Sequence, residues 1–171
     1  KPGANVLLYD DAGDHSALQA AETIANTGAH VEVMTPDRTF APDVMAMNLV
    51  PYMRNLQDKD VRFTVTWRLM AAEKEGNQLK AVIGTDYSKH REERHFDQIV
   101  VNHGTLPLDD LYFELKPQSL NKGEMDQTSL IEGKPQPWAG DGFELYRIGD
   151  AVAGRNTHAA IYEALRLMKE V

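Results

Sequence analysis

The sequence predicts an α/β protein built on a parallel sheet with helical crossovers, and three observations support this class. The first 35 residues alternate a buried strand, a helix and a second buried strand. Two strands joined by a short glycine-containing turn then indicate an antiparallel hairpin. A last strand, a tight turn and an amphipathic helix follow near the end of the chain.

The β-α-β unit at the start is the clearest element. Asn5–Tyr9 is a continuous apolar run, which is typical of a strand buried on both faces. A helix follows over about Ala17–Asn26, and either Asp14 or Ser16 can cap it. Val31–Met34 is the next strand, so the pattern predicts two parallel strands joined by a right-handed crossover.

The middle of the chain predicts further strands around a hairpin. A helix that starts or kinks near Pro51 and ends by Asp58 leads to a strand at Val61–Val65. The hairpin strands are joined at residues 75–77, and a charged loop precedes another buried strand. The hairpin strands, the charged loop and the buried strand are expected at Arg68–Lys74, Leu79–Tyr87, Lys89–His95 and Gln98–Asn102.

The pattern changes after residue 105. Leu106–Lys116 is a short apolar and acidic segment that we expect to be partly helical. Residues 117–142 lack periodicity, so we expect a long loop there, which is usually functional or in contact with another part of the protein. Phe143–Ile148 reads as a strand and Asn156–Val171 as the final helix. That helix has an expected apolar face of Ile161, Leu165 and Met168.

Composition excludes several function classes. The 171 residues include 18 Lys and Arg and 26 Asp and Glu, giving a formal net charge of −8 with no basic stripe, so nucleic acid and anionic membranes are not expected as partners. Cysteine is absent, which removes disulfides, thiol catalysis and iron–sulfur ligation from this chain.

Its six histidines are scattered without metal-ligand spacing, so no metal site is predicted. No apolar run approaches the about 20 residues of a membrane span. Because the chain starts at Lys1, directly before an apolar strand, we expect a processed protein or a fragment.

The turn after the first strand is the first candidate site. In a dinucleotide-binding β-α-β unit this turn is rich in glycine, and the helix N-terminus stabilises a pyrophosphate. Here the turn holds three carboxylates, Asp10, Asp11 and Asp14, with no nearby group expected to offset them. We therefore predict that it does not bind NAD or NADP in the usual way. Helix capping is the preferred explanation of the acids.

A second interpretation of the same acids is a receiver-like phosphoacceptor domain, which places an acidic pair after its first strand to bind Mg²⁺. Val6–Asp11 resembles that beginning. Such a domain also needs an aspartate at the end of its third strand and a lysine after its fifth. Those positions here lead into Thr66-Trp67 and into Asn102-His103, so the likeness stops after the first element.

The second candidate site is the turn Gly149-Asp150-Ala151, which lies between a strand and an amphipathic helix. A capping aspartate at an ordinary turn would explain the dipeptide alone. The order of all elements says more: a β-α-β unit, a third strand, an antiparallel hairpin, a closing strand ending at Gly104, and then this turn. That order resembles a nicotinamide-type lobe nested inside a flavin-type lobe, as in flavoproteins with two dinucleotide folds.

Together, the Asp10-Asp11-Ala12-Gly13 turn and the Gly149-Asp150-Ala151 ending resemble the C-terminal region of trimethylamine dehydrogenase-like NADH:flavin oxidoreductases. This Old Yellow Enzyme-like group includes dienoyl-CoA reductases and N-methyl amine and amino acid demethylases. The resemblance covers most of residues 4–171. It implies a degenerate Rossmann-like NAD(P)-type lobe at residues 1–105, and the C-terminal strand–helix part of a flavin-type lobe at residues 106–171.

The resemblance also implies cofactors and binding residues. The flavin-type lobe, completed by residues upstream of Lys1, would hold FAD or ADP, and an N-terminal barrel would hold FMN and a [4Fe–4S] cluster and do the substrate chemistry. Six residues carry over to the cofactor side of the lobes: Gly104, Gly149, Asp150, Ala151, Asn156 and Thr157.

The function implied is that of a C-terminal fragment of a cytoplasmic flavin-dependent oxidoreductase, a methylated-amine dehydrogenase or demethylase or a related NADH:flavin oxidoreductase. From the acidic turn we expect the intact protein to pass electrons onward rather than to take them from NAD(P)H. No catalytic residue is expected in the fragment itself. Its expected partners are the barrel of the same polypeptide, a second copy of the chain and an electron-transfer flavoprotein. Two alternatives remain open: the receiver-like domain, and a scaffold lobe that binds no nucleotide and only mediates assembly.

Overall fold

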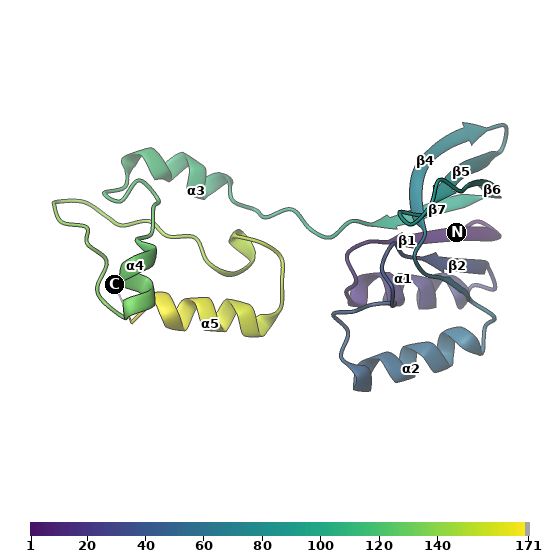
Figure 1. Cartoon of the computed structure of the whole chain (residues 1–171), viewed down its shortest axis with the longest axis horizontal. Helices are drawn as coiled ribbons and strands as arrows, with labels where there is room; N and C mark the ends of the chain where they lie inside the picture. Colours follow the sequence, from purple (N-terminus) through teal and green to yellow (C-terminus); the bar gives the residue numbers. More distant parts are fainter. Residues whose placement is uncertain (170–171) are drawn as a thin grey trace. The chain divides into compact units, whose positions relative to one another are not determined.

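The computed structural model describes residues 1–169 and divides the chain into two compact units, unit 1 at residues 1–104 and unit 2 at residues 105–171 (Figure 1). The predicted α/β class is confirmed. Unit 1 contains a parallel four-stranded sheet and a separate antiparallel three-stranded sheet. Unit 2 consists of short helices joined by irregular segments.

The parallel sheet of unit 1 follows the predicted β-α-β start. Strands β1 (Asn5–Asp10) and β2 (His30–Met34) pair in parallel, and α1 (His15–Ala25) connects them. Asp14 is the residue that caps α1, because its carboxylate accepts a hydrogen bond from the Ser16 N–H at 2.8 Å. With β3 (Arg62–Thr64) and β7 (Gln98–Asn102), the strand order is β3-β2-β1-β7.

Helix α2 (Ala46–Gln57) connects β2 to β3 and contains Pro51. The expected end by Asp58 is confirmed, but the helix begins well before Pro51 and continues through it. Pro51 is exposed and is the sixth residue of the helix, beyond the first turn, whose N–H groups have no partner inside the helix. Its missing N–H removes the hydrogen bond that the Met47 carbonyl would otherwise accept, and the helix nevertheless continues on both sides of Pro51.

The antiparallel sheet joins β4 (Arg68–Glu75), β5 (Gln78–Gly84) and β6 (Arg91–Phe96) in that order. The predicted hairpin is confirmed, with Gly76 in its turn. The charged loop expected at Lys89–His95 is wrong, because most of it is the edge strand β6. A charged side chain of β6 forms an ion pair across the sheet, because Glu93 Oε1 lies 3.6 Å from Lys80 Nζ on the neighbouring strand β5.

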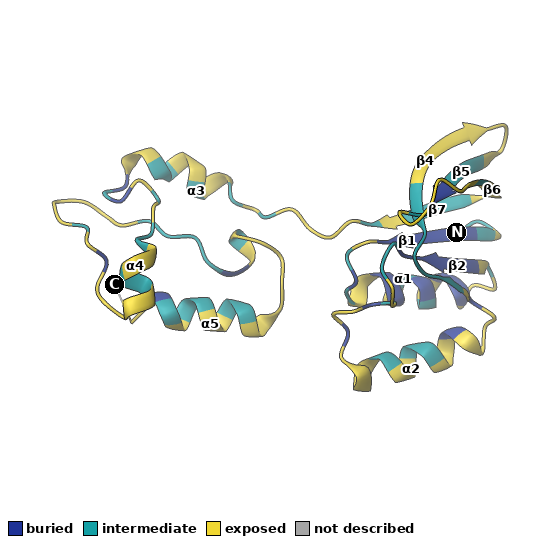
Figure 2. Cartoon of the chain, in the orientation of Figure 1, coloured by how far each residue is buried: buried dark blue, intermediate teal, exposed yellow. Residues whose placement is uncertain are grey.

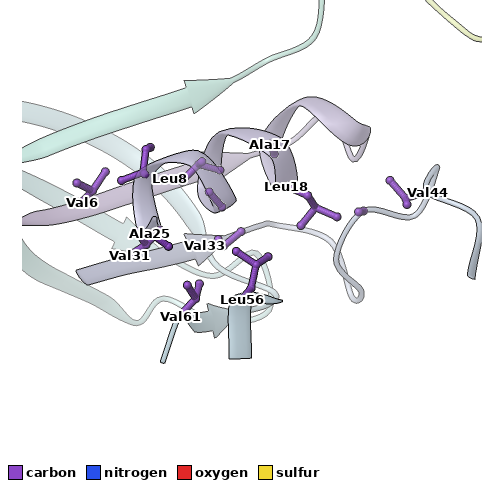
Figure 3. Close-up of a cluster of buried hydrophobic side chains, with 13 residues drawn as sticks. Val6, Leu8, Ala17, Leu18, Ala25, Val31, Val33, Val44, Leu56 and Val61 are labelled. Carbon is purple, nitrogen blue, oxygen red and sulfur yellow. The ribbon is translucent and has the colours of Figure 1, made fainter. Parts of the chain in front are cut away.

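Two apolar clusters cover the two faces of the parallel sheet. Val6 and Leu8 of β1 pack with Leu18 of α1 and Leu56 of α2 in the larger cluster (Figure 3). The alternate residues of β1 pack against the antiparallel sheet, where Ile83 belongs to the smaller cluster. Both faces of β1 are therefore buried, as its continuous apolar sequence predicts.

One buried carboxylate links the two sheets of unit 1. Glu32 in β2 is 7% exposed, and its Oε1 accepts hydrogen bonds from the Thr64 hydroxyl and from the Arg94 guanidinium, both at 2.6 Å. Arg94 belongs to β6 of the antiparallel sheet, and its guanidinium also binds Glu92. The pair fixes the two sheets against each other at a defined register.

Unit 2 contains three α-helices and two 3₁₀ turns among its described residues. The expected partial helix at Leu106–Lys116 is confirmed by α3, and the expected long loop at 117–142 contains a short helix, α4. The elements are α3 (Asp110–Leu115), η1 (Lys116–Gln118), α4 (Gln127–Glu132), η2 (Gly149–Ala151) and α5 (Thr157–Leu167).

The strand expected at Phe143–Ile148 is wrong, because no strand pairs with this segment in the described chain. Its backbone is bonded instead to the loop before it. The Asn121 side chain accepts from the Leu145 N–H and donates to the Leu145 carbonyl, both at 2.9 Å. The Asn121 side chain thus makes the hydrogen bonds that one residue of a neighbouring strand would make. A strand requires such backbone hydrogen bonds along several residues.

Unit 2 buries little apolar surface (Figure 2). Leu167 is its one buried apolar residue among those described, whereas Ser119, Asn121 and Gln136 are buried polar residues. The expected apolar face of α5 is exposed: Ile161, Leu165 and Met168 are each more than half accessible. The helix ends at Leu167, with Met168 as its C-cap, so it ends before Val171, the expected end, which itself lies outside the described residues.

Among residues 1–169, no helix has the length and apolar character needed to cross a membrane.

Candidate functional site

The acidic turn between β1 and α1 is held by hydrogen bonds to all three of its carboxylates. Asp10 Oδ1 accepts from the backbone N–H of Ala12 at 3.2 Å and of Gly13 at 3.1 Å. The same oxygen accepts from Asn102 Nδ2 at 3.0 Å, and that amide also donates to Asp14 at 3.0 Å. The third carboxylate, Asp11, lies 2.8 Å from His103 Nδ1. The expectation that nothing offsets these acids is therefore wrong.

Asp10 is the most buried of the three, with 2% of its surface exposed. Burial raises the pKa of its carboxyl group, and the hydrogen bonds from Gly13, Ala12 and Asn102 oppose that rise. The nearby Asp14 raises it further. The carboxylate is thus placed in a poorly solvated position where donors of the protein replace water.

Gly13 permits this turn. Its φ angle is +75°, in the left-handed region that side-chain-bearing residues avoid. A Cβ atom there would also lie 2.7 Å from Cδ of Pro42. The turn therefore retains a glycine for both conformation and space, although its hydrogen bonds differ from those of a phosphate-binding loop.

The second candidate, Gly149-Asp150-Ala151, forms the 3₁₀ turn η2, which lies against α5. Gly149 is buried with a φ angle of +58°, and a Cβ there would lie 3.3 Å from Cβ of Ala160. Its N–H donates to Glu163 Oε2 at 2.7 Å. Asp150 is exposed and Ala151 is half-buried.

Asn156 and Thr157 form the N-terminal end of α5, and both are exposed. Asn156 caps the helix, because its side-chain oxygen accepts from the Ala159 N–H at 2.9 Å. The contact between Gly149 and Ala160 places η2 beside the first turns of this helix. Unit 2 therefore brings together five of the six predicted site residues.

Gly104, the sixth residue, belongs to unit 1 and follows β7. Its φ angle is +80°, and its N–H donates to Asn102 Oδ1 at 3.3 Å. This contact orients the Asn102 amide, whose nitrogen binds Asp10 and Asp14. In the structure Gly104 thus supports the acidic turn of unit 1.

A cavity of about 350 Å³ opens next to η2 within unit 2. Apolar residues line it together with Tyr112, Tyr146, Arg147 and Arg166. The Arg147 guanidinium lies 4.8 Å from the centre of the Tyr112 ring and pairs with Asp109. This surface can bind planar or anionic groups, or can be covered by another part of a polypeptide.

Sequence reasoning missed the residues that position both candidate sites, notably Asn102 and Glu163. Asn102 could have been found, because strands adjacent in a parallel sheet end at the same edge and β7 ends beside β1. Glu163 forms a hydrogen bond with Arg155 as well as with Gly149, and these contacts lower the pKa of its carboxyl group, Arg155 contributing most. Nothing in the local sequence distinguishes it from a surface glutamate.

Comparisons with known proteins match the whole chain. It is 64% identical to a probable N-methylproline demethylase of Rhizobium meliloti over 100% of this chain. It is 41% identical to the N,N-dimethylglycine/sarcosine dehydrogenase of Chromohalobacter salexigens over 99% of this chain. The chain spans about a quarter, 26%, of the length of each relative. No model of a protein family matches it.

The fold matches histamine dehydrogenase from Rhizobium sp. 4-9 with a TM-score of 0.68 and 20% identity, over 99% of this chain and 23% of that one. The predicted resemblance to the C-terminal region of trimethylamine dehydrogenase-like NADH:flavin oxidoreductases is confirmed. Other structural neighbours of the chain are flavoprotein oxidoreductases, in agreement with the fold class.

The strand order separates this family from the receiver-like alternative. In the doubly wound order of receiver-like domains, the first strand lies between the second and the third. Here β1 lies between β2 and β7, and β3 is at the far side of β2. The order 3-2-1 followed by a later strand is that of a dinucleotide-binding fold, so the receiver-like interpretation is not favoured.

Proposed function

We propose that this chain is the C-terminal part of a flavin-dependent dehydrogenase that removes a methyl group from an N-methylated amine or amino acid. The observation that carries the proposal is the match over essentially the whole chain to two relatives whose names state demethylation of N-methylproline and dehydrogenation of N,N-dimethylglycine or sarcosine. The higher identity, 64%, favours a cyclic N-methyl amino acid. A flavin bound in the intact protein would supply the two-electron oxidation of the N–CH₃ group, and hydrolysis of the oxidised product would release the carbon as formaldehyde.

In this proposal unit 2 is the end of a flavin-type lobe that holds FAD or ADP. Gly149 and Ala151 provide a turn with little side chain, and Asp150 presents an exposed carboxylate beside them. A carboxylate suits the hydroxyl groups of a ribityl chain or ribose, because it accepts their hydrogen bonds, whereas it would repel a pyrophosphate. Asn156 and Thr157 would lie at the same side, at the start of α5.

Unit 1, with Gly104 at its end, is in this proposal a degenerate nicotinamide-type lobe. The strand order and the β-α-β unit fit such a lobe, and the acidic turn does not fit a phosphate. Electrons would therefore enter from the amine and leave to another protein, an electron-transfer flavoprotein, rather than arrive from NAD(P)H.

The rest of the proposed protein is a barrel upstream that carries FMN and a [4Fe–4S] cluster and contains the substrate pocket. This chain alone would have no activity. Two features of unit 2 support the proposal that another part of the same polypeptide packs against it. The apolar face of α5 is exposed, and no described strand pairs with residues 143–148. We further propose that the intact protein is a cytoplasmic homo-oligomer.

The test is anaerobic titration of the intact protein. N-methylproline is expected to bleach the flavin and to release formaldehyde once an electron acceptor is added, whereas NADH is expected to leave the flavin oxidised. Rapid, stoichiometric reduction by NADH would contradict the role given to unit 1. Absence of both FAD and ADP after denaturation would instead favour a scaffold lobe that only mediates assembly.

Asp150 offers a test of the proposed cofactor turn. Asp150→Asn is expected to reduce retained FAD or ADP several-fold in the purified intact protein, because the amide accepts hydroxyl hydrogen bonds less strongly than a carboxylate. Asp141→Asn, another exposed aspartate of unit 2, is the matched control and should retain the full amount. Equal retention in both variants would remove Asp150 from the site.

A further inference from the structure

We infer that the Asp10 carboxylate occupies the anion position of the β1–α1 turn, and that it is the residue that closes unit 1 to the phosphates of a dinucleotide. The inference rests on the proposed function, because it explains how a nicotinamide-type lobe comes to refuse NAD(P)H. Dinucleotide-binding lobes hold the pyrophosphate with backbone N–H groups of the turn after the first strand. In unit 1 the N–H groups of Ala12 and Gly13 both point at Asp10 Oδ1.

The position is filled from inside the protein. Asp10 is the last residue of β1 and is 2% exposed, so its carboxylate reaches the turn from beneath rather than from solvent. A phosphate oxygen would need the same two donors and would meet a negative charge at hydrogen-bond distance. Both effects oppose binding, since the donors are already satisfied and the like charges repel each other in a poorly solvated place.

Asn102 is the positioning residue of this arrangement. It lies directly opposite Asp10 in the parallel pairing of β1 with β7. Its Nδ2 donates to Asp10 and to Asp14, while its Oδ1 accepts from the Gly104 N–H. The side-chain amide is thereby fixed in one orientation, with its nitrogen toward the acids.

Capping of the helix does not account for Asp10. Asp14 caps α1 through the Ser16 N–H, so the helix has its cap without Asp10. Asp10 instead takes the two amides that precede the helix. A carboxylate that merely stabilised the turn would leave no anion-binding position behind when removed, and this difference can be measured.

The experiment is hydrogen exchange of the intact protein, read by mass spectrometry on peptides covering residues 9–17, with and without inorganic phosphate at constant ionic strength. In the wild type, phosphate is expected to change nothing. In Asp10→Ala, the amides of Ala12 and Gly13 should exchange about tenfold faster than in the wild type. Phosphate should then slow their exchange at least about threefold. Asp43→Ala, an exposed carboxylate near the same turn, should behave as the wild type.

Protection of the wild-type turn by phosphate would overturn the inference, because the position would then be open. Faster exchange in Asp10→Ala without any response to phosphate would overturn it as well, and would leave Asp10 as a turn stabiliser. Should Asp10→Ala fail to fold, Asn102→Ala is the second variant, because it keeps the Asp10 carboxylate but removes the amide that donates a hydrogen bond to it. The same two backbone amides should then exchange about threefold faster than in the wild type. Unchanged exchange in Asn102→Ala would contradict the inference too. These readouts need no turnover, so failure of the proposed dehydrogenase activity remains distinguishable.

Discussion

Unit 1 and unit 2 differ in how their elements are held together. Of the twenty buried apolar residues among residues 1–169, nineteen belong to unit 1 and one, Leu167, to unit 2. Unit 2 relies instead on buried polar groups such as Asn121, and on ion pairs such as that between Arg147 and Asp109. Apolar burial is the main favourable term in folding, so we expect unit 1 to fold by itself and unit 2 to depend on contacts with another part of the protein.

The largest expected effect comes from separating the units. Residues 1–104 expressed alone should unfold in one cooperative transition, because they contain both apolar clusters. Residues 105–171 expressed alone should show no cooperative transition and little near-ultraviolet dichroism from Trp138. Urea titration followed by circular dichroism measures both. A cooperative transition of residues 105–171 would show that the comparison between the units is wrong.

Leucine truncations test the same contrast inside one chain. Leu8→Ala should destabilise residues 1–171 by about 3 kcal/mol, because Leu8 is fully buried between the sheet and α1. Leu165→Ala, at 56% exposure, should change the stability of this chain by less than about 0.5 kcal/mol. In the intact protein Leu165→Ala should cost more, if the rest of the polypeptide covers α5. Equal effects in both contexts would contradict that covering.

Asn121 tests the polar support of unit 2. Asn121→Ala should expose residues 143–148 to faster hydrogen exchange, with a local loss of about 2 kcal/mol, because the Leu145 N–H and carbonyl lose their partner. Gln127→Ala, at an exposed position of the same unit, is the control and should change little. Unaltered exchange in Asn121→Ala would mean that the segment is held by other contacts.

The smallest effect concerns pH, where the two units should respond with opposite signs. The pKa of Asp10 is raised by burial, so the wild type loses stability as pH rises through that pKa, and Asp10→Asn should gain relative to it between pH 4 and pH 7. In unit 2, hydrogen bonds from Ser129 lower the pKa of Asp126, the cap of α4. Asp126→Asn should therefore lose stability relative to the wild type as pH rises from below that pKa toward neutrality.

Urea denaturation of the intact protein and of its two variants at pH 2.5, pH 4 and pH 7 measures this contrast, because the window for Asp126 lies below pH 4 and that for Asp10 above it. The same pH trend in both variants would remove the distinction between a buried carboxylate and a cap.

The sequence predicted those elements whose partners lie inside the chain. The β-α-β start was predictable because β1 is apolar at every position from Val6 to Tyr9 and pairs with strands of the same unit. The segment 143–148 has the composition of a strand, but a strand forms only against neighbouring strands. Among the described residues, its backbone bonds to the Leu120 N–H and to the Asn121 side chain, and not to a strand. The edge strand β6 was missed because its charged residues show no apolar alternation, as is common at sheet edges.

The candidate site divides in the same way. The Gly149-Asp150-Ala151 turn and the Asn156 cap were found from local signals, a glycine-aspartate pair and a helix start. The partners of the acidic turn were not found, because Asn102 is 92 residues from Asp10 and reaches it only through the sheet register. Local chemistry is visible in a sequence, whereas its long-range supports require the topology.

The shared amide of Asn102 has a consequence for how this lobe can change over evolutionary time. Because one nitrogen binds both Asp10 and Asp14, substitution of any one of the three leaves a polar group of the others without its partner. A lineage that restored a glycine-rich turn one substitution at a time would pass through less stable ancestors at each step. In the proposed function, where unit 1 is a degenerate nicotinamide-type lobe, we therefore expect epistasis among these three residues to disfavour a return to dinucleotide binding.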